Sequence, residues 1–458
     1  MYKIDFNHPI HIYFIGIGGI SMSGLAEILA ERNFTVSGSD AKSSALTEML
    51  ETHGIKIFYG QRSENITNDI DLVVYTAAIK DDNPELCAAK SLNIPTMSRA
   101  QLLGQMMCNY QTPIAISGTH GKTTTTSMVS EILLQAELDP TLSIGGILKT
   151  IGGNIRIGAS DFFVTEACEY TNSFLSFFPK IAIILNVEED HMDFFHNIEE
   201  IRTSFHNFAK LLPADGTLII NGDIEEVESI TKGLECNIIT YGSKNTFDYY
   251  PENITYDEFA RPTYTLCHGD EKHEITLGVT GEHNVHNSLA SVALSHLLGI
   301  DLATTQKALI HFTGSDRRFE YKGKLGEVTI LDDYAHHPTE ITATLNAAQN
   351  YPHNRVVCVF QPHTYTRTKA FMDDFAKALS QADIVVLADI YAAREKDTLG
   401  ISSLDLLEKI KEIGTECYHF PTFDEIETFL LEKCEKNDLL ITMGAGDVVK
   451  IGEKLLGQ

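Results

Sequence analysis

The sequence predicts an α/β protein of three successive domains, and its length, its apolar runs and its glycine turns carry this prediction. The 458 residues correspond to two to four domains at about 100 to 200 residues per domain. Short apolar runs bounded by Gly, Asp or Asn alternate with helical patterns throughout, which is typical of parallel α/β units. Glycine-rich turns follow the first strand of the first two blocks. We therefore expect domains at residues 1–108, 113–313 and 314–458, the first and third of them Rossmann-like.

The first block opens on a strand and a glycine turn. Its expected strands are His11–Ile15, Phe34–Ser37 and Leu72–Tyr75, and a helical pattern continues through Ala30. The second strand leads directly to Asp40. The block closes near Met107, and residues 108–112 (CNYQT) are typical of a linker.

The second and third blocks repeat the alternation of strand and helix. In residues 113–313 we expect strands at Pro113–Ser117, Phe162–Thr165, Ile181–Leu185 and Leu218–Ile220. In residues 314–458 we expect strands at Val328–Leu331, Val356–Phe360, Ile384–Leu387 and Leu439–Thr442. Buried strands of parallel sheets have this continuous apolar character.

Composition excludes several classes of protein. The 35 Lys and Arg residues stand against 63 Asp and Glu residues, and the net charge of −28 argues against partners such as duplex nucleic acid or an anionic membrane. The N-terminus lacks the basic region and cleavage site of a signal peptide, and no apolar run approaches ~18 residues. The eight cysteines form no C-x-x-C pair. We expect a cytoplasmic protein with reduced cysteines, a monomer or weak homo-oligomer, that acts on small molecules.

The strongest functional signal is the turn SGTHGKTT at residues 117–124, between an expected strand and an expected helix. Backbone N–H groups of such a turn wrap around a phosphate, and the helix N-terminus adds positive potential. Lys122 would reach the β and γ oxygens, and the Thr123 hydroxyl could hold Mg²⁺. The strict phosphate-loop pattern has Gly where this chain has Ile116, so only the form G-T-x-G-K-T is met. We predict a nucleoside-triphosphate site and a P-loop ATPase-type central domain; a plain glycine turn with a surface lysine is the alternative. The residues concerned are Gly118, Thr119, His120, Gly121, Lys122, Thr123 and Thr124.

A second glycine turn, GIGGIS at residues 16–21, follows the first strand. Asp40 lies at the end of the next strand, at the distance that the dinucleotide fingerprint requires. Ser21 stands where that fingerprint has its third glycine. We favour a bound diphosphate over an unliganded turn or an ordinary nicotinamide site, because the turn and the acid occur together.

Acids and a histidine follow two strands of the second block. Glu166 follows the run Phe162–Thr165, and Asp190-His191 follows the run that begins at Ile181. Ligands of open α/β sheets bind at the carboxyl ends of strands, so both positions share the edge that presents the phosphate loop. We therefore predict Thr123, Glu166 and His191 as Mg²⁺ ligands. A hydrogen-bonded structural histidine is the alternative for His191. Glu169 is interpreted as a helix-start or supporting carboxylate.

Further polar groups cluster later in the chain. Asn284 and Asn287 are spaced to share one helix face, where an amide could contact a base edge, but taken alone the segment is interpreted as a structural helix cap. In the third block, arginines and acids at strand ends suit phosphate, ribose or carboxylate groups, and each could instead be a surface ion-pair group. These sets are Asp316–Phe319, Asp332–Pro338 and Gln361–Arg367.

Taken together, these segments resemble the Mur ligase family over essentially the whole chain. The resemblance is carried by GIGGISMS (16–23), SGTHGKTTTT (117–126), EACEYTNSF (166–174), DHMD (190–193), GEHNVHN (281–287), RRFE (317–320), DDYAHHP (332–338), QPHTYTRT (361–368) and YAAREK (391–396). The GIGG and SMS segments and the histidine in GTHGKT resemble the alanine-adding branch or its tripeptide-recycling relative.

The resemblance implies a role for each domain and for particular residues. The first domain would hold the uridine diphosphate of UDP-N-acetylmuramate, the central domain would bind ATP, and the third would close over ATP and bind the amino acid. The implied UDP-sugar contacts are Gly16, Gly18, Gly19, Ser21 and Asp40. Lys122, Glu166 and His191 would be catalytic, with Asn284, Asn287, Arg318 and Asp333 also contacting ATP, and His337 and Arg367 contacting the amino acid.

The implied reaction joins L-alanine to the lactyl carboxylate of UDP-N-acetylmuramate through an acyl phosphate, with ATP and Mg²⁺ required. Attachment of a preformed tripeptide to the same UDP-sugar is the alternative within the family. A nicotinamide-dependent dehydrogenase would leave the phosphate loop unused. An ATP-driven switch or motor would leave the first and third domains unexplained.

Overall fold

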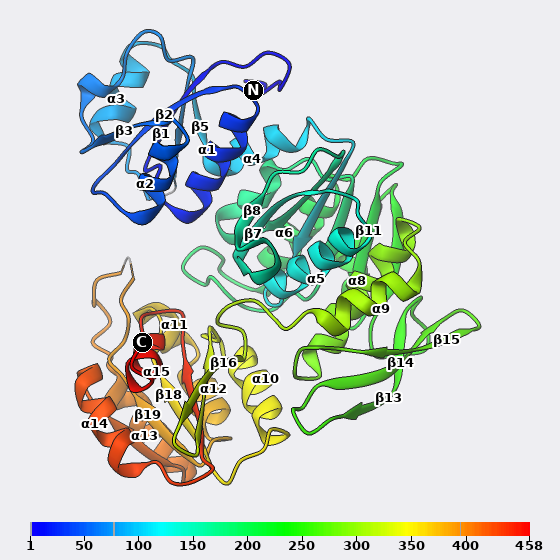
Figure 1. The fold of residues 1–458 in the computed structure, drawn as a ribbon, viewed down its shortest axis with the longest axis vertical. Helices are drawn as coiled ribbons and strands as arrows, with labels where there is room; N and C mark the ends of the chain where they lie inside the picture. The colour runs from blue at the N-terminus through cyan, green and yellow to red at the C-terminus, as the bar shows by residue number, and fades with distance from the viewer. Residues whose placement is uncertain (1, 77, 394) are drawn as a thin grey trace.

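A computed structural model describes residues 2–76, 78–393 and 395–458. Within these ranges the chain forms three successive α/β units, as predicted (Figure 1). The N-terminal unit and the C-terminal unit lie at opposite ends of the long axis, and the central unit contacts both.

The N-terminal unit is a parallel sheet with strand order β3-β2-β1-β4-β5. Its strands are β1 (His11–Ile15), β2 (Thr35–Asp40), β3 (Lys56–Tyr59), β4 (Leu72–Tyr75) and β5 (Thr96–Ser98), and its helices are α1 (Ile20–Glu31), α2 (Ala45–Thr52), α3 (Pro84–Ser91) and α4 (Arg99–Met107). The three predicted strands are present, with β2 starting one residue later and continuing through Asp40. The glycine turn joins β1 to α1 at the carboxyl edge of this sheet.

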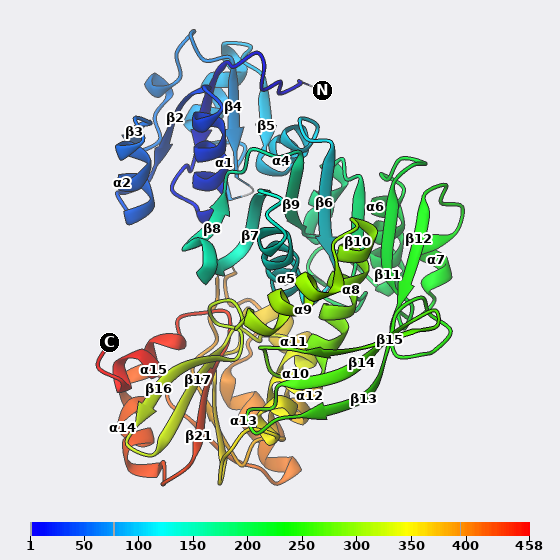
Figure 2. The same cartoon turned by 45° about the vertical axis from the view of Figure 1, so that its right-hand side comes forward.

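The central unit is built on a sheet with strand order β12-β11-β10-β6-β9-β7-β8 (Figure 2). Its strands are β6 (Thr112–Ser117), β7 (Thr141–Leu148), β8 (Gly153–Arg156), β9 (Phe162–Ala167), β10 (Ile181–Ile184), β11 (Thr217–Asn221) and β12 (Asn237–Tyr241); its helices are α5 (Lys122–Gln135), α6 (Ile198–Ala209), α7 (Val227–Thr231), α8 (His283–Leu297) and α9 (Leu302–His311). The apolar strands β6, β9 and β10 pair in parallel in its middle, which brings their carboxyl ends together. Strand β8 alone is antiparallel to its neighbour in this sheet, within the described residues.

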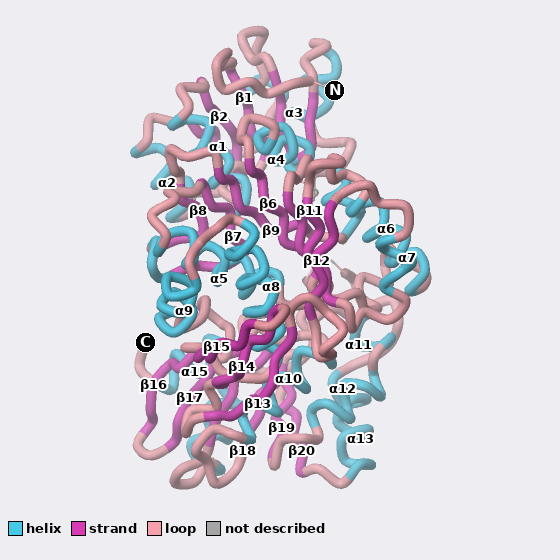
Figure 3. Tube along the Cα trace, turned by 90° about the vertical axis from the view of Figure 1, so that its right-hand side faces the viewer, coloured by secondary structure: helices cyan, strands magenta, loops and turns pink. Residues whose placement is uncertain are grey.

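A separate antiparallel sheet, which the sequence analysis did not predict, belongs to the central unit. It consists of β13 (Tyr250–Tyr256), β14 (Pro262–His268) and β15 (Glu271–Thr276). Helix α8 contacts both this sheet and the main sheet, so it lies between them (Figure 3). Residues of β14 are buried or half-buried, whereas most of β15 is exposed.

The C-terminal unit is a sheet with strand order β16-β17-β21-β18-β19-β20. Its strands are β16 (Glu320–Leu325), β17 (Val328–Asp333), β18 (Val356–Phe360), β19 (Ile384–Leu387), β20 (Glu416–His419) and β21 (Leu439–Met443); its helices are α10 (Pro338–Gln349), α11 (Tyr365–Ala370), α12 (Met372–Leu379), α13 (Ser403–Ile413), α14 (Phe423–Lys433) and α15 (Val449–Leu455). All four predicted strands are present. Strand β16 is antiparallel to β17, and the other strands pair in parallel.

Gly104 on α4 allows the N-terminal unit to pack closely against the central unit, because a Cβ atom there would overlap the carbonyl oxygen of Ser176. We expect Gly104→Ala to lower the free energy of unfolding by about 1–3 kcal/mol, since the two segments must separate to admit the methyl group. Chemical denaturation would measure this loss. Gly153→Ala is the matched control, because a Cβ atom at Gly153 would meet nothing within 4 Å. Equal stability of the two variants would contradict the expectation.

Candidate active site

The phosphate loop lies where β6 ends and α5 begins. Gly118 and Gly121 have positive φ angles of 146° and 81°, and the Cβ atom of another residue at Gly121 would lie 2.7 Å from Oδ1 of Asn287. Glycine at this position therefore allows Asn287 to approach the loop. Helix α5 starts at Lys122 without a side-chain cap in the part of the chain that the structure describes. Its first N–H groups are oriented to bind an anion.

The ammonium group of Lys122 lies inside this loop. It donates hydrogen bonds to the carbonyl oxygens of Gly118 and Thr119, and forms an ion pair of 3.1 Å with Oε2 of Glu169. Burial alone would lower the pKa of Lys122, but the Glu169 carboxylate outweighs burial and raises that pKa. Lys122 is therefore a fixed positive charge. Glu169, interpreted from the sequence as a supporting carboxylate, holds it in place.

Thr123 and Glu166 meet on the other side of the loop. The Thr123 hydroxyl donates to Oε2 of Glu166 over 3.2 Å, and the backbone N–H of Gly145 donates to Oε1 over 2.6 Å. Burial raises the pKa of Glu166 despite these donors. A divalent cation would bind to this pair of oxygen donors, the hydroxyl and the buried carboxylate, and would neutralise the charge of the carboxylate.

His191 lies beside a different carboxylate from the one predicted. Its Nε2 is 3.8 Å from Oε1 of Glu169 and 3.7 Å from Oδ2 of Asp190, and its ring centroid is 4.6 Å from that of Tyr170. Between His191 and either Thr123 or Glu166, the described residues show no hydrogen bond or ion pair. The predicted metal set is thus divided into a Thr123–Glu166 pair and a neighbouring His191.

A cavity of about 900 Å³ opens between the phosphate loop and the C-terminal unit. Seven of its lining residues were predicted to contact ATP: His120, Gly121, Thr124, Asn284, Asn287, Arg318 and Asp333. Asn287 donates from Nδ2 to Oδ1 of Asn284 over 2.9 Å, so the two amides share one face of α8 as predicted. Both side chains are buried. Helix α8 begins at His283, so both asparagines lie within the helix and neither is its N-cap residue.

Arg318 and Asp333 reach this cavity from the C-terminal unit. The Asp333 carboxylate accepts from the backbone N–H groups of Phe319 (2.8 Å) and Ala335 (2.7 Å), and burial raises the pKa of Asp333 to about 6. The Arg318 guanidinium lies 5.1 Å from the ring centroid of Tyr334. The residues that precede Arg318 and Asp333 in the chain form an ion pair, between Arg317 Nε and Asp332 Oδ2 at 2.9 Å.

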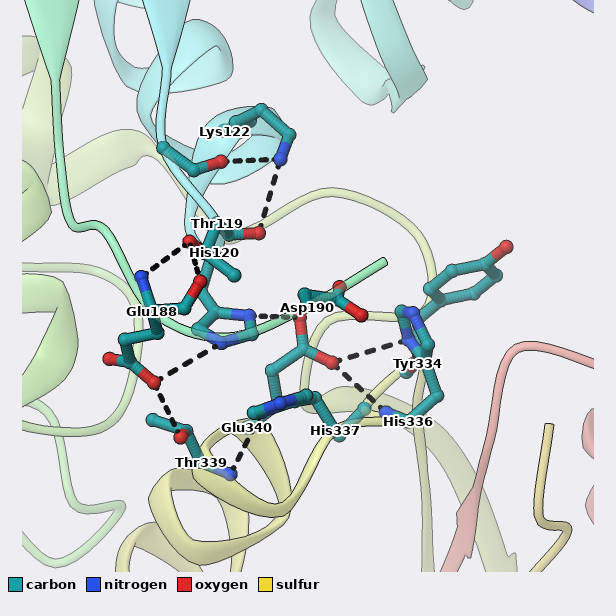
Figure 4. A network of polar contacts seen from close by, with 12 residues as sticks. Thr119, His120, Lys122, Glu188, Asp190, Tyr334, His336, His337, Thr339 and Glu340 are labelled. Atoms are coloured by element: carbon teal, nitrogen blue, oxygen red, sulfur yellow. Dashed lines mark hydrogen bonds and ion pairs between the residues drawn. The ribbon is translucent and has the colours of Figure 1, made fainter. Parts of the chain in front are cut away.

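Three consecutive residues after β10 hold the C-terminal unit against the phosphate loop. Figure 4 shows one of these contacts, between Glu188 and Thr339. Glu188 accepts from the Thr339 hydroxyl over 2.7 Å, and the Glu189 carbonyl oxygen lies 3.0 Å from Nε2 of His337. The Asp190 carboxylate forms an ion pair of 2.8 Å with Nη2 of Arg367. We call this set of contacts the interdomain clasp. It includes both residues, His337 and Arg367, that were predicted to contact the amino acid.

His120 extends the clasp into the phosphate loop itself. Its Nδ1 lies 3.1 Å from Oε1 of Glu340, and its Nε2 lies 3.5 Å from Oε2 of Glu188. Its backbone N–H donates to Oδ1 of Asn186 over 2.7 Å. Burial alone would lower the pKa of His120, but hydrogen bonds to the two carboxylates outweigh burial and raise that pKa to about 9.

This shift predicts that stability depends on pH. A pKa raised from 6.5 to about 9 stabilises the folded state fully below pH 6.5, and this contribution is lost as pH rises through about 9. The difference corresponds to about 3 kcal/mol at most. We expect thermal unfolding between pH 6 and pH 10 to show a steeper loss of stability for the native chain than for His120→Asn. Parallel curves for the two proteins would contradict this assignment.

The N-terminal glycine turn is a second candidate binding site. The backbone N–H of Gly16 donates to the Ser39 carbonyl oxygen over 2.8 Å, and that of Gly18 donates to Oδ2 of Asp40 over 2.9 Å. Gly19 and Ser21 are exposed at the start of α1. The turn and the acid thus lie in direct contact.

Comparison with known proteins assigns a family. Residues 11–111 match the Mur ligase family catalytic domain, 116–295 the Mur ligase middle domain, and 317–446 the Mur ligase glutamate ligase domain. The chain belongs to the Mur ligase family. Its sequence is 61% identical to the UDP-N-acetylmuramate–L-alanine ligase of Agathobacter rectalis over 457 residues, and 60% identical to that of Lachnospira eligens over 458, covering 100% of both chains in each case.

Solved structures of other Mur ligases share the fold. The UDP-N-acetylmuramate-alanine ligase of Thermotoga maritima aligns with a TM-score of 0.81 and 29% identity over 98% of each chain. The murein peptide ligase of Psychrobacter arcticus aligns with a TM-score of 0.70 and 26% identity, also over 98% of each chain. The three-domain α/β architecture predicted from the sequence is therefore confirmed.

Some residues of this Mur ligase site were not predicted. Asn186 and Glu188 lie one and three residues after the predicted strand Ile181–Leu185. The rule that ligands bind at the carboxyl ends of strands, which selected Glu166, could therefore have found them. Glu340 lies in the first turn of α10, two residues after DDYAHHP. Its contact with His120 crosses 220 positions and leaves no local signal. Of the YAAREK segment that supports the family resemblance, Arg394 lies outside the described residues.

In the described parts of this Mur ligase, no helix is long and apolar enough to cross a membrane.

Proposed function

We propose that this chain is an ATP-dependent, ADP-forming ligase that joins L-alanine to the lactyl carboxylate of UDP-N-acetylmuramate. The observation that carries the proposal is the full-length identity of 61% to a UDP-N-acetylmuramate–L-alanine ligase. A phosphate loop that opens into a large interdomain cavity is the arrangement that ATP-driven ligation requires.

ATP would bind with its phosphates on the loop at residues 118–124 and its base in the cavity. Lys122 supplies a fixed positive charge for the β and γ oxygens, and the first N–H groups of α5 add further donors. Asn284 and Asn287 would contact the base from α8. Arg318 and Asp333 would contact the nucleotide from the C-terminal unit.

Mg²⁺ would be held by Thr123 and Glu166, whose hydroxyl and buried carboxylate are the hard oxygen donors that this cation prefers. When bound, Mg²⁺ neutralises phosphate charge and orients the γ-phosphate. The imidazole of His191 is a softer donor, and we propose that it binds a cation near the substrate carboxylate, close to Glu169.

UDP-N-acetylmuramate would place its diphosphate at the glycine turn of the N-terminal unit. The turn from Gly16 to Ser21 would face the diphosphate, with Gly19 and Ser21 exposed at the start of α1. The N–H of Gly18 now donates to Asp40, and ligand binding would release this carboxylate to contact the ribose.

The reaction follows from these positions. A lactyl carboxylate oxygen attacks the γ-phosphorus in line. The bond between the γ-phosphorus and the oxygen that bridges the β- and γ-phosphates breaks, and ADP leaves with the electron pair of that bond. Lys122 and the loop N–H groups stabilise the charge on the γ oxygens. The deprotonated alanine amine then attacks the acyl phosphate carbon, and the tetrahedral species collapses to an amide and phosphate.

The interdomain clasp would exclude water during these steps, since water would hydrolyse the acyl phosphate. Arg367 and His337 both belong to the interdomain clasp. Asp190, the ion-pair partner of Arg367, also lies 3.7 Å from Nε2 of His191. We propose that Arg367 binds the alanine carboxylate and that His337 lines the same pocket. Attachment of a tripeptide is less well supported, because the murein peptide ligase of Psychrobacter arcticus is only 26% identical to this chain.

ADP release in the presence of Mg²⁺ tests the proposal. We expect release to require both UDP-N-acetylmuramate and L-alanine, and to fall to background without Mg²⁺. Release that is unchanged when either substrate is omitted would overturn the ligase assignment. Faster turnover with murein tripeptide than with L-alanine would favour the alternative.

A further inference from the structure

Two histidines and a carboxylate converge where the central unit meets the C-terminal unit. They are His120 in the phosphate loop, Glu188 after β10, and His337 at the start of α10 (Figure 4). One ligand atom from each lies within 4.8 Å of the other two, and the rings of His120 and His337 have their centroids 4.7 Å apart. Neither Thr123 nor Glu166 belongs to this group.

We propose that His120, Glu188 and His337 form a binding site for a divalent transition-metal ion such as Zn²⁺. Two imidazole nitrogens and one carboxylate oxygen are a common Zn²⁺ donor set, whereas Mg²⁺ prefers oxygen donors alone. The site is therefore chemically distinct from the Thr123–Glu166 pair. The separation of 3.5 Å between Nε2 of His120 and Oε2 of Glu188 fits two ligands of one tetrahedral ion.

The groups around the three ligands support this proposal. Nδ1 of His120 lies 3.1 Å from the Glu340 carboxylate, and Nε2 of His337 lies 3.0 Å from the Glu189 carbonyl oxygen. When each of these nitrogens carries the proton, the opposite nitrogen of the ring is free to bind a metal. Metal-bound histidines usually donate their other N–H to a carboxylate or carbonyl oxygen in this way.

The competing hydrogen bonds at the metal-facing atoms are few among the described residues. Nδ1 of His337 accepts one long hydrogen bond of 3.3 Å from the backbone N–H of Thr339. Oε2 of Glu188 accepts from the Thr339 hydroxyl over 2.7 Å, an arrangement that also orients a metal-bound carboxylate. Metal binding would displace a proton from His120. The carboxylates of Glu188 and Glu340 stabilise positive charge at this position, whether a proton or a metal ion carries it.

The site would couple metal binding to domain position. Two ligands come from the central unit and one from the C-terminal unit, so the ion can bind all three only while the units are docked. Such an ion would bind the docked units more tightly than the separated units and would therefore favour the docked arrangement. Because His120 is part of the phosphate loop, an occupied site would also hold that loop fixed.

Co²⁺ is the spectroscopic probe for this site, because near-tetrahedral coordination gives it intense visible absorption. We expect titration of the full chain, in excess Mg²⁺, to produce this absorption and to saturate at one equivalent. Glu188→Gln and His337→Asn should each weaken Co²⁺ binding at least about tenfold. Glu340→Gln should weaken it about 10- to 100-fold through the orientation of His120.

Two controls separate this site from others. Glu189→Gln removes the adjacent exposed carboxylate and should leave the absorption unchanged. Glu166→Gln should also retain it, because Glu166 belongs to the Mg²⁺ pair. Circular dichroism checks the fold of each variant, and His337→Asn decides the question if Glu188→Gln does not fold.

Absorption typical of octahedral Co²⁺, binding that survives both Glu188→Gln and His337→Asn, or binding that Glu166→Gln abolishes would overturn the proposal. None of these measurements requires turnover. Failure of the metal site and failure of the ligase assignment are therefore distinguishable.

Discussion

Replacing Lys122 with alanine is expected to lower the rate of ADP release by about 10³-fold or more while leaving the fold intact. The Lys122 ammonium is a preorganised positive charge, held by two loop carbonyl groups and by Glu169. Charge spreads over the γ oxygens in the transition state of phosphoryl transfer, so the loss removes transition-state stabilisation. It also leaves the buried Glu169 carboxylate without its cationic partner, which lowers stability. Steady-state ADP release with both substrates measures this effect.

Lys307→Ala is the matched control for Lys122→Ala, because Lys307 is an exposed lysine on α9 of the same unit. It should retain the native rate. Circular dichroism should show the same helical content for both variants. Near-normal turnover of Lys122→Ala would remove this lysine from the mechanism.

The sequence was most informative where function depends on local geometry. The turn at residues 118–121 needs glycines with positive φ between a strand and a helix, and both flanking elements were predicted from apolar patterns. Asp40 was predicted at the end of the strand that follows the glycine turn, and because adjacent parallel strands bring their carboxyl ends together, it lies within hydrogen-bond distance of Gly18.

The sequence was least informative about strands without a continuous apolar run. Strands β15 (EKHEIT) and β16 (EYKGKL) carry charged residues on exposed faces and have antiparallel partners. Prediction from buried apolar runs therefore missed them.

Contacts between distant segments also escaped prediction. Arg367 was predicted to face a substrate carboxylate, whereas its partner in this structure is Asp190, 177 positions away. Local spacing gives no information about such a pair. The position of Asp190 after a strand correctly placed it at the carboxyl edge of the central sheet. Which arginine it pairs with depends on how the central and C-terminal units dock.

Arg367→Ala is expected to lower kcat/KM for L-alanine by about 10²-fold or more. The two side chains of its ion pair with Asp190 are only 11% and 8% exposed, so truncation leaves a buried carboxylate without its cationic partner. Loss of one partner from such a pair costs about 2–5 kcal/mol. Burial alone would raise the pKa of Asp190, and it is His191 and Arg367 that lower it. The pKa of Asp190 should therefore rise in the variant, weakening the interdomain clasp.

The matched control is Lys409→Ala, which breaks an exposed ion pair with Asp373 in the same unit and should change kcat/KM by less than about fivefold. A double-mutant cycle then separates two causes of the Arg367→Ala loss. If the loss arises from the stranded charge, adding Asp190→Asn should restore part of it, since the neutral amide no longer needs a cation. If Arg367 acts only by binding the alanine carboxylate, the second substitution should restore nothing. If this one guanidinium serves domain docking and also, as we propose, substrate binding, we expect partial recovery of kcat at saturating L-alanine, while KM for L-alanine remains raised.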